Sequence, residues 1–277
     1  MARLFGYLAN QADRLACALA EEQAVLRVAP GSVPDGWGIG FYQAGEVLLR
    51  KRPMGAQGEV DFLELTRDLR SDALLGHVRA ATVGNLRQEN THPFRYRQWL
   101  FAHSGTVERF IAVRGRILES MPEFLRRNIR GDTDSEHLFH LFLAFLFDSG
   151  KLEDADLDVG TAVDAMRTCL TLLDRIVAEV GGEQSGLNVV ATNGRMLVAT
   201  RRGRPLHIRR RHGIKDCTVC RPLAERSGRT AKAVDHDTLR YVIVASEAHE
   251  ISAGWEEIPE GSIVGVRRDL ETTIDRL

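Results

Sequence analysis

Two long helical patterns occupy the middle of the chain, and strand-like runs lie on both sides of them. Residues 135–147 are mostly apolar, and residues 162–180 carry apolar side chains at helical spacing. Strands are expected at 3–8, 35–42, 46–51, 73–80 and 98–103, and again at 186–192, 195–200, 241–246 and 262–266. Shorter helices are expected at 15–28 and 62–69. This separation of strands from helices predicts an α+β fold rather than an alternating parallel sheet.

The composition narrows the class of protein. A chain of 277 residues with 44% hydrophobic content can bury a large core, and it shows no linker or repeat, so one domain is predicted over 1–277 with a basic insertion loop at 207–237. The formal net charge of -1 gives no overall positive potential that would attract nucleic acid or an anionic membrane, so neither partner is expected. Without a leader, a membrane-spanning apolar run or a dense cysteine framework, the chain is expected to be cytoplasmic.

Three short polar segments suggest a pocket for an amino acid. Arg79 ends an expected strand, where its planar guanidinium can hold a carboxylate. Ser104 and Gly105 end another, and the unobstructed N–H of Gly105 can face an oxyanion. Asp134 begins a helix and can bind an ammonium group. Each has an ordinary alternative, namely a surface ion pair, a turn and a helix cap. Together they match the charges of an α-amino acid.

These segments resemble the class II glutamine amidotransferases, and within them the stand-alone bacterial members and the γ-glutamyl hydrolase of ergothioneine biosynthesis. The resemblance is carried by residues 1–6, 35–39, 77–82, 89–94, 101–105, 131–136 and 244–261. It implies an N-terminal-nucleophile hydrolase fold, a four-layer αββα sandwich of two antiparallel sheets. In that family a cysteine exposed by removal of the initiator methionine attacks a γ-carboxamide, and its own amine serves as the base.

The resemblance also implies roles for individual residues. Arg79 would bind the α-carboxylate of glutamine, Asp134 would bind the α-amino group, and Gly105 would donate its N–H to the oxyanion. Thr82 and His92 would line the pocket. The implied partners are glutamine or a γ-glutamyl substrate and, where ammonia is passed on, a protein that accepts it.

The sequence departs from the family at two catalytic positions. Ala2 stands where the family has its cysteine, and a methyl group cannot act as a nucleophile, so the chain is expected to be inactive as written. Ser104 stands where the family usually has asparagine. Ala2 has two explanations: an engineered change in an otherwise active hydrolase, which we favour, or a natural pseudoenzyme that acts as a binding or regulatory module.

A Cys-x-x-Cys pair, Cys217 and Cys220, lies in the basic segment with His207, His212 and His236 nearby. These side chains are of the type that binds zinc, but the histidine spacing is irregular and a second Cys-x-x-Cys pair is missing. The pattern therefore favours a loop that packs two thiols, with structural zinc as the alternative. No cofactor is expected for the chemistry.

Overall fold

The computed structural model describes residues 3–26, 34–53, 60–80, 84–154, 156–222, 235–246 and 253–277. The first half forms β1 (Arg3–Ala9), η1 (Ala12–Arg14), α1 (Leu15–Glu21), α2 (Gln23–Leu26), β2 (Gly36–Gln43), β3 (Glu46–Pro53), α3 (Phe62–Thr66), β4 (Ala73–Arg79), β5 (Phe94–Tyr96), β6 (Trp99–Gly105), α4 (Phe110–Glu119) and α5 (Glu123–Arg126). The second half forms α6 (Asp134–Asp148), α7 (Val159–Glu179), β7 (Leu187–Thr192), β8 (Leu197–Arg201), β9 (Leu206–His212), β10 (Arg240–Ser246), β11 (Trp255–Glu257), β12 (Ser262–Val266) and β13 (Thr272–Arg276).

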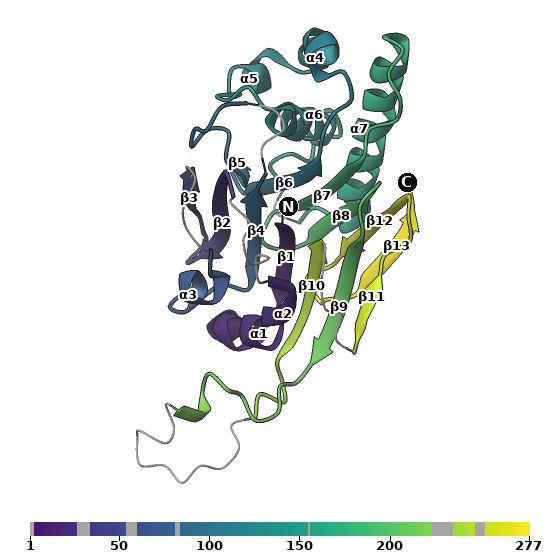
Figure 1. Cartoon of the computed structure of the whole chain (residues 1–277). Coiled ribbons are helices and arrows are strands. Elements are labelled where there is room, and N and C mark those ends of the chain that lie inside the picture. The colour runs from purple at the N-terminus through teal and green to yellow at the C-terminus, as the bar shows by residue number, and fades with distance from the viewer. Residues whose placement is uncertain are drawn as a thin grey trace.

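Two antiparallel sheets form the centre of the molecule (Figure 1). A seven-stranded sheet has the order β11-β9-β10-β1-β4-β2-β3, and a six-stranded sheet has the order β13-β12-β8-β7-β6-β5. Successive side chains of a strand point to opposite faces of its sheet, so half of them from each sheet point into the space between the two sheets. Leu4, Leu75, Ala102 and Val190 pack there in one buried cluster. The two sheets therefore share an apolar interior.

Helices cover the outer face of each sheet. The residues of β1 that point away from the second sheet, such as Phe5, pack with α1 and with Phe62 of α3. On the other side, α4, α6 and α7 cover the six-stranded sheet, and Phe101 of β6 stacks on Phe139 of α6 with ring centroids 5.1 Å apart. The predicted α+β class and the four-layer αββα sandwich are confirmed.

The two long helices begin where the sequence supplies a capping side chain. The Thr133 hydroxyl accepts the Glu136 N–H at 3.3 Å before α6, and the Asp158 carboxylate accepts the Gly160 N–H at 2.8 Å before α7. No helix in the described part of the chain combines the length and apolar character that a membrane crossing requires.

The segment predicted as an insertion loop begins with a strand, so its start at residue 207 is wrong. Residues 206–212 form β9, which lies between β10 and β11 inside the seven-stranded sheet. Leu206 and Ile208 point into the space between the sheets, whereas Arg209 points outward. The run Arg209–Arg211 hid this alternation, because charged side chains are not expected in an interior strand.

The buried carboxylate of Glu22 explains how β9 accommodates an arginine. Glu22 is 2% exposed and directly follows α1. Its oxygens accept hydrogen bonds from Arg209 Nη1 at 3.1 Å, the Tyr241 hydroxyl at 2.6 Å and Trp255 Nε1 at 3.1 Å. A buried charge is tolerated when it is paired and hydrogen-bonded, and here the pairing joins α1 to β9, β10 and β11.

Candidate functional site

Arg79 lies at the end of β4 and is 3% exposed. Its guanidinium donates to the carbonyl of Gly84 at 2.9 Å and to that of Asn85 at 3.2 Å, which orients the planar group. Burial lowers the pKa of Arg79, and the carboxylates of Asp35, Asp132 and Asp134 oppose this change. A guanidinium so held, with acidic groups nearby, remains a cation at neutral pH.

The end of β6 turns at a position that requires glycine. Gly105 has a φ of +142°, and a Cβ placed there would lie 2.0 Å from the carbonyl oxygen of Gly186, so only glycine fits. Ser104 precedes it and is 3% exposed, and its Oγ has no hydrogen-bond partner among the described residues. By strand alternation Ser104 lies on the same side of β6 as Ala102, facing the other sheet.

Asp134 is the first residue of α6 and is 3% exposed. One carboxylate oxygen accepts the N–H of Val107 at 2.8 Å, and the other accepts the N–H of Ser135 at 2.9 Å. The helix start thus holds the chain just after the Gly105 turn. Asp134 both carries negative charge toward Arg79 and positions the turn that follows β6.

Reciprocal hydrogen bonds join the loop before β5 to the segment before α6. Asn90 Nδ2 donates to Asp132 Oδ1 at 2.5 Å, and the N–H of Asp132 donates to Asn90 Oδ1 at 3.0 Å. The Glu136 carboxylate accepts the N–H of Gly131 at 2.6 Å and that of Arg130 at 3.0 Å. These bonds bring the acidic segment 131–136 beside the loop whose carbonyls orient Arg79.

Three buried histidines lie in a layer beneath these groups. The rings of His77 and His92 are 4.1 Å apart between centroids, and those of His92 and His103 are 6.5 Å apart. His103 Nδ1 shares a hydrogen bond of 2.9 Å with Ser135 Oγ, whereas neither ring nitrogen of His77 or His92 has a partner among the described residues. Burial lowers the pKa of His77 to about 3 and that of His92 well below its usual value. All three are neutral at pH 7.

This layer predicts a loss of stability in acid. In the unfolded chain His77 should become protonated below its ordinary pKa of about 6.5. In the folded chain it stays neutral down to its lowered pKa of about 3. Between these two pH values the free energy of unfolding should therefore fall by up to ~1.4 kcal/mol per pH unit for this group. Urea denaturation at pH 7.5, 6.0 and 5.0 measures this fall. The His77→Gln variant should lose less stability over the same range, and parallel losses in the two proteins would exclude His77 as the source.

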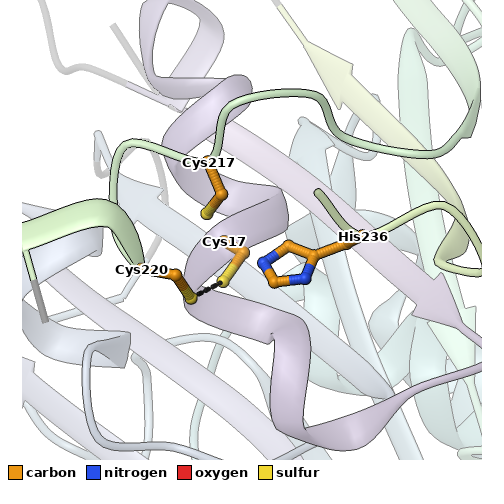
Figure 2. A group of neighbouring side chains, drawn as sticks. All are labelled: Cys17, Cys217, Cys220 and His236. Atoms are coloured by element: carbon orange, nitrogen blue, oxygen red, sulfur yellow. Dashed lines mark hydrogen bonds between the residues drawn. The ribbon is translucent and has the colours of Figure 1, made fainter. Parts of the chain in front are cut away.

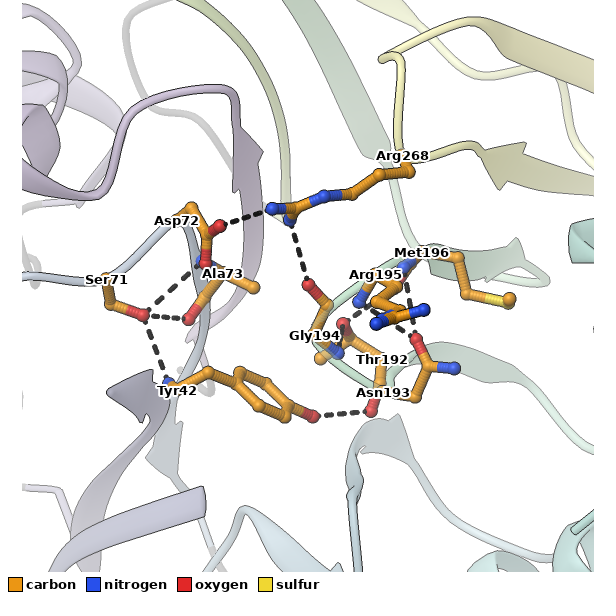
Figure 3. Close-up of polar contacts among 10 residues, drawn as sticks. All are labelled: Tyr42, Ser71, Asp72, Ala73, Thr192, Asn193, Gly194, Arg195, Met196 and Arg268. Carbon is orange, nitrogen blue, oxygen red and sulfur yellow. Dashed lines mark hydrogen bonds and ion pairs between the residues drawn. The ribbon is translucent and has the colours of Figure 1, made fainter. Parts of the chain in front are cut away.

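A separate large cavity of about 1050 Å³ lies at the other end of the strands. Figure 3 shows the contacts beside it, where Arg268 pairs with Asp72 at 2.7 Å and the Tyr42 hydroxyl donates to the carbonyl of Thr192 at 2.9 Å. Asp72 precedes β4 and Arg79 ends it, a separation of about 20 Å along an extended strand. These bonds join the two sheets, and the cavity is remote from Arg79.

The structure brings most of the predicted site residues to one end of the sandwich. Arg79, Ser104, Gly105 and Asp134 come from the ends of β4 and β6 and from the start of α6, and His92 lies on His77 of β4. Ala2 and Thr82 lie outside the described residues. The sequence does not reveal the layer of His77, His92 and His103, since its members are brought together only by the packing of the two sheets.

Comparison with known proteins identifies the family of this chain. The family model described as glutamine amidotransferases class-II matches residues 1–275. The chain is similar to the probable glutamine amidotransferase DUG3 of Saccharomyces cerevisiae, with 27% identity over 84% of this chain and 70% of that protein. It is also similar to the gamma-glutamyl-hercynylcysteine sulfoxide hydrolase of Mycobacterium tuberculosis, with 28% identity over 84% of this chain and 75% of that protein.

Solved structures share the fold. A glutamine aminotransferase class-II domain protein from Silicibacter pomeroyi has a TM-score of 0.59 and 19% identity, covering 99% of this chain and 98% of that one. A predicted glutamine amidotransferase from Pseudomonas aeruginosa has a TM-score of 0.58 and 18% identity, covering 98% and 95%. At such low identity these structures establish only the architecture. The match of the family model over nearly the whole length shows that this chain belongs to the class II glutamine amidotransferases.

Proposed function

We propose that the chain is a single-domain hydrolase scaffold for the γ-amide of glutamine or of a γ-glutamyl compound, and that with Ala2 it binds such a compound without cleaving it. The observation that carries the proposal is the placement of Arg79, Gly105 and Asp134 at one end of the sandwich. Their cation, N–H donor and carboxylate complement a carboxylate, a developing oxyanion and an ammonium group. Released ammonia would go to solvent or to an accepting protein, and a cytoplasmic setting suits either.

The register of β1 supports a nucleophile at the start of that strand. Arg3 pairs with Val78, the residue before Arg79, so the described start of β1 lies beside the end of β4. β1 also contacts β6 across the interior, the strand that ends in Gly105. A reacting group carried at this end of β1 would meet a substrate held by Arg79.

A second candidate function is a non-catalytic binding or regulatory module. Ser104 favours it, because its hydroxyl reaches less far than the asparagine amide that the family usually has there. A protein that had lost catalysis but kept binding would differ from the family at its catalytic positions, as this chain does at Ala2 and Ser104. Both candidates require the pocket to bind glutamine or a γ-glutamyl compound, and only the first requires turnover once a nucleophile is present.

Calorimetry with L-glutamine and with γ-glutamyl dipeptides tests the binding that both candidates share. We expect saturable binding that Arg79→Ala weakens by about 100-fold or more, since a bidentate charge-assisted pair contributes roughly 3 kcal/mol. Arg79→Lys should restore only part of the affinity, because a lysine cannot form the paired contact.

Arg175→Ala is the matched control, since Arg175 is exposed on α7 in the outer helical layer and should leave binding unchanged. Equal affinity of the Arg79→Ala variant and the unmodified chain would contradict the assigned pocket. Absence of binding by the unmodified chain would contradict both candidate functions.

A further inference from the structure

Three cysteines and a histidine converge on the outer side of the seven-stranded sheet, away from the Arg79 pocket. Cys17 comes from α1, Cys217 and Cys220 follow β9, and His236 precedes β10. One possible ligand atom from each lies within 4.8 Å of the other three (Figure 2). The cluster joins positions about 200 residues apart in the sequence, since Cys17 and Cys220 are separated by 203.

Local backbone structure presents these side chains together. The carbonyl of Cys217 accepts the N–H of Arg221 at 3.0 Å, so a helical turn places Cys217 and Cys220 on one side. Beyond the last pair of β9 and β10, the His236 N–H donates to the carbonyl of Ile214 at 2.8 Å, and the Ile214 N–H donates back at 3.3 Å. The hairpin is thereby extended toward α1, with His236 next to the turn.

The spacing of the atoms suits a tetrahedral zinc ion. Zinc–sulfur bonds of about 2.3 Å place neighbouring sulfurs about 3.8 Å apart around a tetrahedral ion. The Sγ atoms of Cys17 and Cys220 are 3.5 Å apart, and the remaining separations are at most 4.8 Å. Contraction of these separations by up to about 1 Å would complete the tetrahedron, and three sulfurs with one imidazole are ligands that zinc prefers.

His236 supplies an independent sign of a missing ligand. The residue is 8% exposed, and its buried Nε2 has no hydrogen-bond partner in the described part of the chain. Figure 2 shows the imidazole directed toward the cysteine side chains rather than away from them. A buried ring nitrogen without a partner costs free energy of folding, and coordination of a metal would remove that cost.

We propose that Cys17, Cys217, Cys220 and His236 bind a structural Zn²⁺ ion. Four protein ligands close the coordination sphere, so the ion would have no open position for chemistry. It would fasten the β9–β10 connection to α1, where Cys17, Cys217 and Ile214 already pack in one apolar cluster. Of the three histidines that the sequence offered, only His236 joins the cluster, whereas His207 lies within β9 and pairs with Ala245.

Metal analysis of the full chain, purified without chelators, tests this site. We expect about one zinc per chain, replaceable by Co²⁺ with the absorption bands of tetrahedral thiolate coordination. Cys17→Ser and His236→Gln should each lower zinc retention under dialysis by at least tenfold. Cys169→Ser is the control, since Cys169 is fully buried in α7, outside the cluster, and should retain the full zinc content.

Two measurements keep the result interpretable if a variant folds poorly. On the unmodified chain, removal of zinc should speed amide hydrogen exchange in residues 213–222 and 235–239, while strands β1 and β4 keep their protection. Thiol counting on the denatured protein identifies the rival state, a disulfide between Cys17 and Cys220. A purified chain without zinc, whether its thiols are free or oxidised, would overturn the proposal, and retention of zinc by Cys17→Ser would overturn the ligand set.

Discussion

Ala2→Cys should convert the chain into an enzyme that releases glutamate from glutamine or from a γ-glutamyl compound. A cysteine at the chain terminus supplies both a thiol that attacks the γ-carbonyl and an amine that accepts its proton. Loss of a nucleophile costs on the order of 10⁶-fold in turnover in hydrolases, and a weaker oxyanion donor costs about 10²-fold. Ser104 is present in both chains and its cost cancels in their ratio, so we expect a gain on the order of 10⁶-fold over the Ala2 chain, to a turnover about 10²-fold below that of a chain with asparagine at 104.

The measurement is glutamate release, with intact mass confirming that Met1 has been removed. Ala2→Ser is the matched control, because a hydroxyl is a far poorer nucleophile than a thiol and should give much less turnover. Adding Ser104→Asn to Ala2→Cys should raise turnover further. A processed Ala2→Cys chain that binds glutamine but cleaves none of the compounds would contradict the hydrolase and leave the binding module.

The sequence predicted the fold class because hydrophobic periodicity is local. Residues 135–147 and 162–180 could be recognised as helices from their own side chains, and the short, mostly apolar run 73–80 could be recognised as a strand. β9 was not predicted because the partner of its buried Arg209 is Glu22, which lies 187 residues away in the sequence. Periodicity cannot reveal a buried charge whose counter-charge comes from another layer of the fold.

The same distinction between local and long-range signals decides which residues of the candidate sites the sequence could reveal. Arg79, Gly105 and Asp134 could be named as candidates from the sequence because each has a local signature, a strand end, a glycine turn and a helix start. Cys17 was not among the predicted metal ligands, since nothing near it in the sequence suggests a metal. Only the packing of α1 against the β9–β10 connection places its sulfur beside Cys220.

Gly105→Ala should abolish most catalysis in the Ala2→Cys background. A Cβ would lie 2.0 Å from the Gly186 carbonyl, and the φ of +142° is strained for alanine. Relief of that contact must move the end of β6 relative to β7, which turns the Gly105 N–H away from the oxyanion position. The kcat should fall by about 10²- to 10³-fold, and the free energy of unfolding should fall as well.

Three variants separate loss of the oxyanion donor from general unfolding. Gly115→Ala, in α4 with open space around the added methyl, should leave turnover unchanged and raise the free energy of unfolding by about 0.5–1 kcal/mol. Ser104→Ala removes a hydroxyl without a clash and should lower kcat at an unchanged KM. Gly105→Ala should lower kcat far more than it raises KM, because the N–H of Gly105 acts on charge that develops only in the transition state. A Gly105→Ala chain with full kcat would show that the oxyanion is stabilised elsewhere, whereas an equal loss in kcat and in glutamine affinity would assign Gly105 a structural role.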